Sequence, residues 1–292
     1  PSHDGPATNR NRILRFSGTT GAYLGEFVAS GAGGVGSINY LTFGLDLGGS
    51  FNGEPDGHSD LFVSSGLTSE VLVFSGVDGT FIDVFVEAGA GGLLNPGTQV
   101  FRSGVGGLEL LVASRDTLEV LWYDGLTGEF LDVFASFPST LQLSQLTDMQ
   151  FGPDGDLYVT AVSVISDVNG IYDRAQVLRI DGETGEFIEV FIPPHSGGWA
   201  SPNPRLMFDG TGDLYVASRD TNQVLRFQGP LSSNPGAFSD VFVQGVGFIL
   251  LTARDINSVG QIVGFGNPRG RRNLTGTKAA YRYTPPAAGE SV

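Results

Sequence analysis

Cysteine is absent from this 292-residue chain, and histidine occurs at only three positions. Without cysteine the chain can form no disulfide, no thiolate metal site and no thiol nucleophile. We find no Gly-x-Ser-x-Gly motif and no Ser-His-acid spacing. The glycine-rich runs at 31–34 and 88–92 precede predicted strands, so they cannot hold a phosphate at a helix start. The set of candidate catalytic residues is therefore small.

Positive charge is also scarce. Lys and Arg total 16 against 31 Asp and Glu, which gives a net charge of −15. This balance disfavours binding to nucleic acid or to anionic membranes and suits the binding of cations. No apolar run is long enough to span a bilayer. The chain begins at Pro1 and shows no signal peptide, so we expect a processed form of an extracellular or cell-surface protein.

What the chain does contain is repetition. The segment Ala175 to Ile192 reads as two strands joined by a glycine turn, because β-branched and aromatic residues flank Asp-Gly and Thr-Gly. Related hairpins begin at Ile13, Val71, Val120 and Val224. Leucines at one position mark the copies, roughly 50 residues apart, a period typical of propeller blades. These leucines are Leu14, Leu72, Leu121, Leu178 and Leu225, with Tyr281 as a degenerate sixth copy.

A second strand pair precedes each of these hairpins except the first. The clearest copies are Leu146 to Val162 and Pro204 to Ser218, where turns such as Gly-Pro-Asp-Gly separate two apolar strands. Inner pairs are predicted at about 38–64, 98–113, 146–162, 204–218 and 250–265. The sequence therefore predicts an all-β protein, a β-propeller of four-stranded antiparallel blades, whose apolar faces pack between neighbouring blades.

The count of third strands exceeds the count of inner pairs by one. We favour five blades, with six as the alternative, and a ring closed by strands from both termini. The predicted domain organisation is an N-terminal extension over 1–10, a single propeller over 11–284 and a C-terminal tail over 285–292.

One loop carries a sharp chemical signal. Asn52, Glu54, Asp56 and Asp60 place oxygen side chains at positions 1, 3, 5 and 9, and the backbone carbonyl of His58 could fill position 7. Hard oxygen ligands at this density suit Ca²⁺, and a glycine at position 6 permits the sharp turn. The sequence therefore predicts a structural calcium site, with a solvated acidic hairpin loop as the alternative.

The stretch from Phe43 to Phe74 resembles an FG-GAP repeat of integrin α-subunit propellers. It departs from that pattern at Asn52, where Asp is usual, and at Glu54, which is longer than usual. Other units resemble NHL-type repeats, and Leu251 to Asn267 resembles a HAF repeat. These resemblances imply a propeller, but the NHL pattern occurs in binding modules, lactonases and lyases alike.

A catalytic alternative would need polar groups at the starts of the inner strands. A gluconolactonase-like propeller would bind one divalent metal there, and Asp148, Asn203 and Asp255 could supply ligands. Nothing in their spacing selects them, and buried or capping roles are the favoured explanation. A lyase of the streptogramin type would need a histidine base. The polar residues at these strand starts are Asn39, Gln99, Asp148, Asn203, Arg205, Arg254 and Asp255.

Several residues are candidates for a ligand or partner surface. His195 and Trp199 share the loop FIPPHSGGWASPNP, and Tyr40 and Trp199 could stack on a glycan. The predicted loop Ser163 to Ala175 is the longest insertion, and such insertions commonly bind partners. Its charged and amide residues are Asp167, Asn169, Asp173 and Arg174. Asn273 begins a glycosylation sequon.

These observations favour a non-catalytic extracellular propeller used for surface interaction or for assembly as a subunit, which binds a protein or glycan partner on its upper face and holds one structural calcium. The alternative is a metal-dependent lactonase or lyase.

Overall fold

The computed structural model describes residues 11–47, 55–104, 106–167, 170–200, 204–244, 248–256, 262–268 and 279–283. For 164–173 and from 248 onward, only the backbone is described. The chain forms two compact units, Pro1–Phe134 and Ala135–Val292. In the described residues every regular element is a β-strand or a short 3-10 turn. None of these turns is long or apolar enough to cross a membrane.

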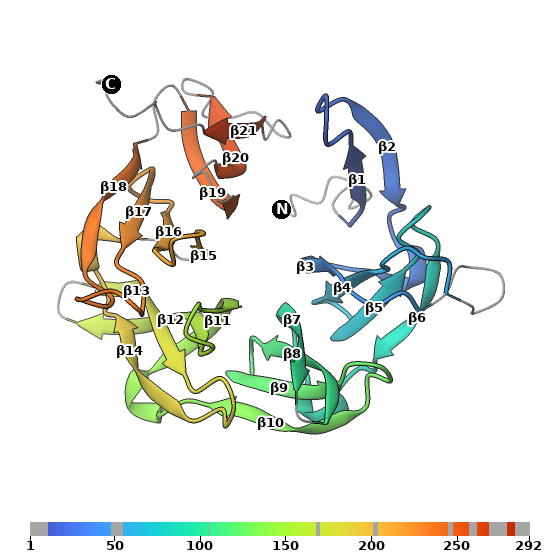
Figure 1. Cartoon of the computed structure of the whole chain (residues 1–292), viewed down its shortest axis with the longest axis horizontal. Helices are drawn as coiled ribbons and strands as arrows, with labels where there is room; N and C mark the ends of the chain where they lie inside the picture. The colour runs from blue at the N-terminus through green and yellow to red at the C-terminus, as the bar shows by residue number, and fades with distance from the viewer. Residues whose placement is uncertain are drawn as a thin grey trace. The chain divides into compact units, whose positions relative to one another are not determined.

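The first unit contains a two-stranded sheet followed by two four-stranded sheets (Figure 1). The two-stranded sheet pairs β1 (Ile13–Phe16) with β2 (Tyr23–Val28). The second sheet has the order β3 (Ile38–Phe43), β4 (Leu61–Ser65), β5 (Glu70–Phe74) and β6 (Phe81–Val86). The third has the order β7 (Pro96–Gly104), β8 (Gly107–Ser114), β9 (Glu119–Asp124) and β10 (Phe130–Ser136).

The second unit contains two four-stranded sheets followed by a three-stranded one. The first consists of β11 (Leu143–Phe151), β12 (Leu157–Asp167), β13 (Gly170–Ile180) and β14 (Phe187–Ile192). The next consists of β15 (Leu206–Phe208), β16 (Leu214–Ser218), β17 (Gln223–Phe227) and β18 (Phe238–Gln244). The last consists of β19 (Phe248–Ile256), β20 (Ile262–Pro268) and β21 (Ala279–Tyr283).

Short 3-10 turns connect several outer strands to the next sheet. They are η1 (Ala32–Gly34), η2 (Ala90–Gly92), η3 (Ser139–Leu141) and η4 (Ser196–Gly198). In η1, η2 and η4 a residue with positive φ precedes the turn and a buried apolar residue follows it. Three repeats thus share one connection geometry.

The strand registers repeat from sheet to sheet. Arg179 on β13 lies opposite Tyr158 on β12 and Glu189 on β14, and Arg226 on β17 lies opposite Tyr215 and Asp240 in the same way. These pairings are antiparallel, and the β5–β6, β13–β14 and β17–β18 pairs share two register shifts, one directly before the leucine of the third strand and one after the residue that follows it. The sequence repeat is therefore also a structural repeat.

The core lies between neighbouring sheets of each unit. Phe62 and Val73 of one sheet cluster with Leu110 and Val112 of the next. In the second unit, Tyr158 and neighbouring side chains of its sheet cluster with Leu214, Val216 and Phe227 of the next sheet. Neither sheet of such a pair buries both of its faces alone, as the sequence predicted.

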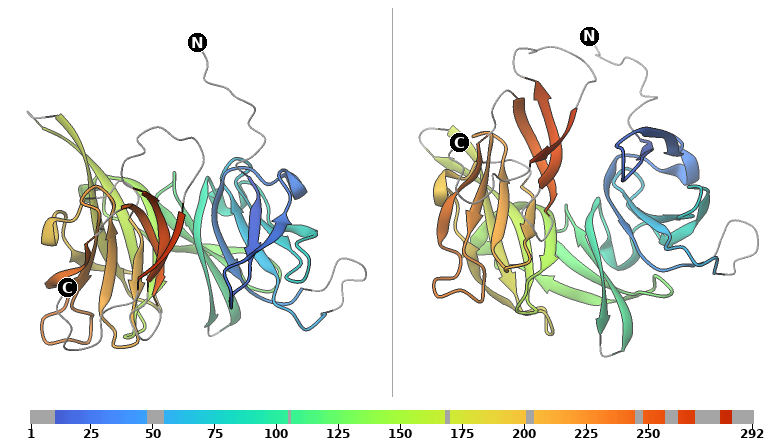
Figure 2. Two further views of the ribbon diagram at one scale, coloured as in Figure 1. Left: turned by 90° about the horizontal axis from the view of Figure 1, so that it is seen from above. Right: turned by 45° about the horizontal axis from the view of Figure 1, so that its top comes forward.

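The predicted strand–turn–strand units and their four-strand order are confirmed. The predicted Ser163 to Ala175 loop is wrong: β12 and β13 continue as a paired hairpin to Asp167 and Gly170, extending past β14 (Figure 2). The third strand paired with β20 is β21, while β1 forms its own sheet with β2. The blade number, ring closure and single domain over 11–284 stay predictions.

Candidate functional site

The predicted calcium loop connects β3 to β4, and its described part is held by carboxylates that accept backbone N–H groups. Asp46 accepts from the N–H of Asp56 at 3.2 Å and from that of Gly57 at 2.6 Å. Asp56 accepts from the N–H of His58 at 2.9 Å. Asp46 was not predicted as part of this loop, although it is an acid three residues after the preceding strand. These contacts fix the turn around Gly57, whose φ of 86° favours glycine.

Asp60, at the end of this loop, is fully buried. Its two carboxylate oxygens accept the N–H of Leu47 at 2.7 Å and that of Gly76 at 3.0 Å. Burial is the largest effect on Asp60 and raises its pKa above the usual range. The hydrogen bonds from the N–H groups of Leu47 and Gly76 lower this pKa, and the charges of Asp46 and Asp56 raise it, so the net direction is upward. A cation at this loop would relieve that cost.

The predicted ligands Asn52 and Glu54 lie outside the described residues, as does Asn273. Within the described part of the chain, no group of three or more acidic or histidine side chains gathers as a metal site. The calcium site therefore stays a prediction.

The position of Asp60 recurs in two other sheets. Asp156 accepts the N–H of Gly182 at 3.2 Å, and Asp213 accepts that of Gly229 at 3.3 Å. A Cβ at Gly182 would lie 1.9 Å from the carbonyl oxygen of Gly155, so the bond requires glycine there. In these three sheets the aspartate directly before the second strand joins the two hairpin turns of its sheet.

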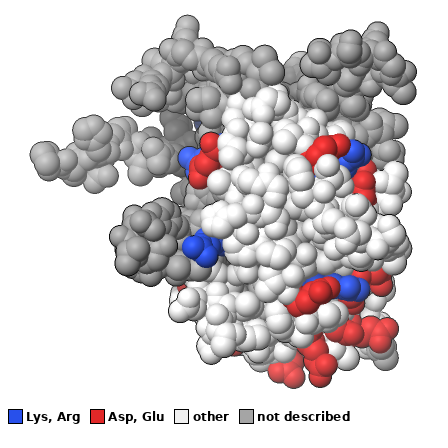
Figure 3. Space-filling model, turned by 90° about the vertical axis from the view of Figure 1, so that its left-hand side faces the viewer, with Lys and Arg blue, Asp and Glu red and all other residues white. Residues whose placement is uncertain are grey.

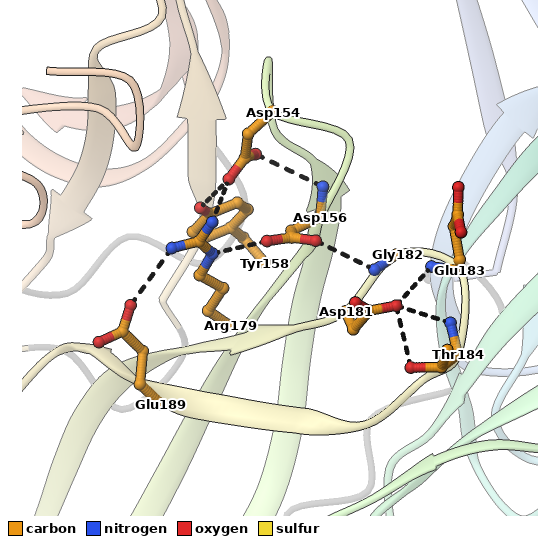
Figure 4. Close-up of polar contacts among 9 residues, drawn as sticks. All are labelled: Asp154, Asp156, Tyr158, Arg179, Asp181, Gly182, Glu183, Thr184 and Glu189. Atoms are coloured by element: carbon orange, nitrogen blue, oxygen red, sulfur yellow. Dashed lines mark hydrogen bonds and ion pairs between the residues drawn. The ribbon is translucent and has the colours of Figure 1, made fainter.

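In the β11–β14 sheet a cation completes the same arrangement (Figure 4). The guanidinium of Arg179 lies 2.7 Å from Asp154, 2.7 Å from Asp156 and 3.4 Å from Glu189. The hydroxyl of Tyr158 donates to Asp154 at 2.9 Å. Burial and this bond to Asp154 raise the pKa of Tyr158. In the β3–β6 sheet, Val73 stands at the position of Arg179. The third strand therefore supplies no guanidinium to the acidic loop.

The adjoining turn in Figure 4 is built by Asp181. Its carboxylate accepts the N–H groups of Glu183 at 3.0 Å and Thr184 at 2.7 Å, and the hydroxyl of Thr184 at 2.9 Å. The hydrogen bond from the Thr184 N–H lowers the pKa of Asp181 most. This aspartate has a local structural role.

Charge on the molecular surface follows the same pattern. Figure 3 shows one face on which most basic side chains touch acidic ones, while further acidic side chains gather at its lower edge. This face therefore presents excess negative charge, in keeping with the net charge of −15.

The polar residues at the inner strand starts connect neighbouring sheets. Asn39 donates to the Oδ1 of Asn95 and to the carbonyl of Pro96, both at 2.8 Å. Gln99 donates to the carbonyl of Phe62 at 2.8 Å. These side chains join the β3–β6 sheet to the β7–β10 sheet.

Asp148 has a similar position in the second unit. Its carboxylate lies 3.2 Å from the guanidinium of Arg205 and accepts the N–H of Leu206 at 3.1 Å. Thr147 donates to the carbonyl of Pro204 at 3.1 Å, as Asn39 does to Pro96. Asn203 and the side chains of Arg254 and Asp255 are outside the described residues.

The structure separates the two residues of the predicted ligand loop. Trp199 is 1% exposed, and its indole N–H donates to the carbonyl of Ala217 at 3.2 Å. The expectation of an exposed stacking ring is therefore corrected for Trp199: it is a core residue, as Leu93 is after η2. His195 is exposed, with φ 64°, where Gly89 occupies the corresponding position with φ 75°.

The remaining surface candidates lie on strands. Tyr40 is half-buried on β3, opposite Ser64. Asp167 pairs with Gly170 at the end of the β12–β13 hairpin, and Asp173 and Arg174 follow on β13, whereas Asn169 lies outside the described residues.

Neither a sequence family nor a curated protein matches this chain. Solved structures with a similar fold include a structural-genomics target described as a candidate gluconolactonase. That match has a TM-score of 0.52 and 13% identity, and it covers 80% of this chain and 73% of the other. A second is hydrazine synthase from Kuenenia stuttgartiensis, with a TM-score of 0.51, 11% identity and coverage of 94% and 78%. At these identities the likeness concerns the fold, and this chain has a propeller-like all-β fold.

Proposed function

We propose that this chain is a non-catalytic β-propeller module of a secreted or cell-surface protein that binds a protein or glycan partner. The observation that supports this best is the use of the polar side chains at the inner strand starts. Asn39, Gln99, Asp148 and Arg205 are engaged with the neighbouring sheet. Such side chains hold the sheets together and are not free to turn toward a substrate.

The partner surface in this proposal includes the β12–β13 hairpin. This hairpin extends beyond its neighbouring strand and carries Asp167, Asp173 and Arg174. A paired hairpin presents these residues on a stiffer support than a loop would, which lowers the entropy cost of binding.

Calcium stabilises the module in this proposal by binding to the loop that ends at Asp60. The donor chemistry fits, since Asn52, Glu54 and Asp56 offer oxygen ligands and the carbonyl of His58 adds another. The pKa of Asp60 is raised because burial disfavours its charged carboxylate, and a divalent cation beside it would offset that free-energy cost. Bound calcium would supply positive charge to fold the loop and would take no part in a reaction.

A metal-dependent lactonase is the second candidate, because one similar structure is described as a candidate gluconolactonase. Asp148, Asn203 and Asp255 would be its metal ligands. In that case Asp148 would have to exchange its contact with Arg205 for the metal.

The test compares binding and turnover on the same preparation. The chain is incubated with a panel of lactones and with Ca²⁺, Mg²⁺, Mn²⁺ or Zn²⁺ in turn, and is also applied to a glycan array and to intact cells. We expect no turnover above the blank, and binding that is lost when residues 165–172 are replaced by a tight Asn-Gly turn. Metal-dependent lactone hydrolysis that is lost in Asp148→Ala would overturn the proposal in favour of the lactonase.

A further inference from the structure

The β12–β13 hairpin continues past both of its neighbouring strands (Figure 2). β11 pairs with β12 no further than Ser163, and β14 pairs with β13 only from Val177 onward. Beyond Ser163, residues 164–167 pair with 170–173 and, in the described part of the chain, with no third strand. We call this two-stranded extension the arm.

The edge of β13 from 170 to 176 is therefore open along the line of β14. β14 ends at Ile192, and Pro193 and Pro194 follow it directly. Proline has no N–H to give to a strand partner, and the carbonyl of Pro193 accepts the N–H of Ser196 in the next turn. β14 thus cannot extend along β13 to cover this edge. The N–H and C=O groups of an unpaired edge form a template for an added strand.

The arm also contains too little sheet to be stable on its own. A two-stranded ribbon in water is marginal, and a third strand or a packing partner is needed to stabilise it. The register places Ile165 opposite Tyr172 and Ile171 opposite Ser166, so both faces of the arm carry large apolar residues. An added strand on β13 would supply the missing third strand.

One cation at the base of the arm lacks a counter-charge. Arg174 is half-buried, and its Nε is buried without a hydrogen-bond partner among the described residues. It lies opposite Ser163, whose hydroxyl donates to the carbonyl of Leu141 and accepts from Gln176, both at 2.7 Å. The strand arginines that bind a carboxylate of their own sheet are Arg102, Arg179 and Arg226. Arg174 is therefore available to a carboxylate from a partner.

The residue before Arg174 defines the order of charges that fits. Asp173 and Arg174 are consecutive on β13, so they lie on opposite faces of the strand. In an antiparallel pair, directly opposite residues share a face. An added antiparallel strand that fits would thus carry an acidic residue opposite Arg174, followed directly by a basic residue opposite Asp173. Charges on an edge disfavour other strands, so this order also gives specificity.

A second copy of β13 does not meet this requirement. When two identical strands pair in antiparallel order, residues from opposite faces never lie directly opposite each other. Asp173 of one copy therefore cannot meet Arg174 of the other, and a register centred on either residue brings two like charges together. The charges of this edge favour a partner polypeptide over self-association.

We propose that the 170–176 edge of β13 binds an extended segment of a partner polypeptide by antiparallel strand addition, with an acidic and a basic residue opposite Arg174 and Asp173. This inference rests on the proposed function, because it names the way in which the hairpin would hold a protein partner. The segment would occupy the place that β14 leaves open and would give the arm its third strand.

The experiment titrates two fluorescent peptides into the full chain and measures anisotropy. Ser-Val-Glu-Lys-Ile-Val-Ser can place glutamate opposite Arg174 and lysine opposite Asp173, whereas Ser-Val-Lys-Glu-Ile-Val-Ser has the same composition with the two charges exchanged. We expect the first peptide to bind about tenfold more tightly, because the exchange turns two attractive cross-strand pairs into two repulsive ones. The double variant Asp173→Arg with Arg174→Asp should reverse this preference.

Two further measurements locate the binding. The first peptide should slow hydrogen exchange at 170–176 in the unaltered chain. Arg219→Asp is the matched control, because Arg219 is an exposed arginine directly after β16 of the next sheet, and it should leave the preference between the peptides unchanged.

Equal affinity for the two peptides, or a preference that the double variant does not reverse, would overturn the proposal. So would the absence of binding, or self-association of the chain that the double variant abolishes, since the edge would then be covered or would belong to a second copy. None of these results decides the proposed function, which is tested by hairpin-dependent binding to cells or glycans and by the absence of lactone turnover.

Discussion

The turn region of the β11–β14 sheet and the acidic loop of the β3–β6 sheet share one aspartate contact but differ in the length of the connection and in the residue that faces the carboxylates. Asp156 and Asp60 occupy the same position, and each accepts the N–H of the glycine after the third strand. In the first region Arg179 lies among the carboxylates, whereas in the second Val73 takes that place. Clustered carboxylates need a counter-charge. The comparison teaches that one region carries its cation in the chain, whereas in our proposal the other region takes a cation from solution.

The largest effect should come from removing the internal cation. Arg179→Met leaves Asp154 and Asp156 partly buried without their partner, which we expect to cost about 3 kcal/mol of unfolding free energy. Urea denaturation measures it. Arg12→Met, which removes an exposed ion pair to Glu26, is the control and should cost no more than about 0.5 kcal/mol. Equal costs for both variants would remove the basis of the comparison.

The next effect concerns the external cation. Calcium at a hundredfold excess over its dissociation constant should stabilise the chain by about 2.7 kcal/mol relative to EGTA. Asp56→Ala should abolish this response, whereas Asp181→Ala, in a turn acid of the other region, should leave it intact. Thermal melting with and without EGTA gives the answer. If the melting midpoint of the unaltered chain is the same with and without EGTA, the calcium site is ruled out.

A smaller effect concerns the pH dependence of stability in EGTA. Because the pKa of Asp60 is raised in the folded state, the folded chain binds this proton first as the pH falls. Relative to Asp60→Asn, the chain should therefore gain stability as the pH falls through the raised pKa toward 3.8. Added calcium should weaken or reverse this trend. Urea unfolding between pH 4 and 7 measures it, and parallel curves for the two proteins would contradict it.

The smallest effect compares one turn in two sheets. His195 adopts a left-handed conformation that Gly89 holds without strain. His195→Gly should stabilise the chain by about 1 kcal/mol, and Gly89→His should destabilise it by a similar amount. Denaturation midpoints report both. If His195→Gly lowers stability, the histidine makes a contact that outweighs the strain.

The strand pairs were predictable from the sequence because period-two apolar patterns and glycine turns define them locally. Leu146 to Val162 is an example, since each apolar residue marks a face and Gly-Pro-Asp-Gly marks the turn. The β12–β13 hairpin was missed although Asn169-Gly170 is a hairpin signal between apolar residues. The length of that segment suggested a loop instead.

The site was less predictable because its contacts join distant segments. Aligning Trp199 with Leu93 across the repeats would have shown that the ring belongs to the core. Arg179 and Asp156 are 23 residues apart, and only the strand register brings them together. The sequence did contain a signal for the missing cation, because the third strand reads VLRI in one repeat and VLVF in another. The arginine of the first is replaced by valine in the second.

The hydrogen bonds from Asn39 to Pro96 and from Thr147 to Pro204 each join sheets that are consecutive in the sequence. Since each bond connects nearest neighbours, a pulling force applied to the chain ends should detach one sheet at a time. Stretched between an optical trap and a surface, the chain should lengthen in successive steps of about one repeat each.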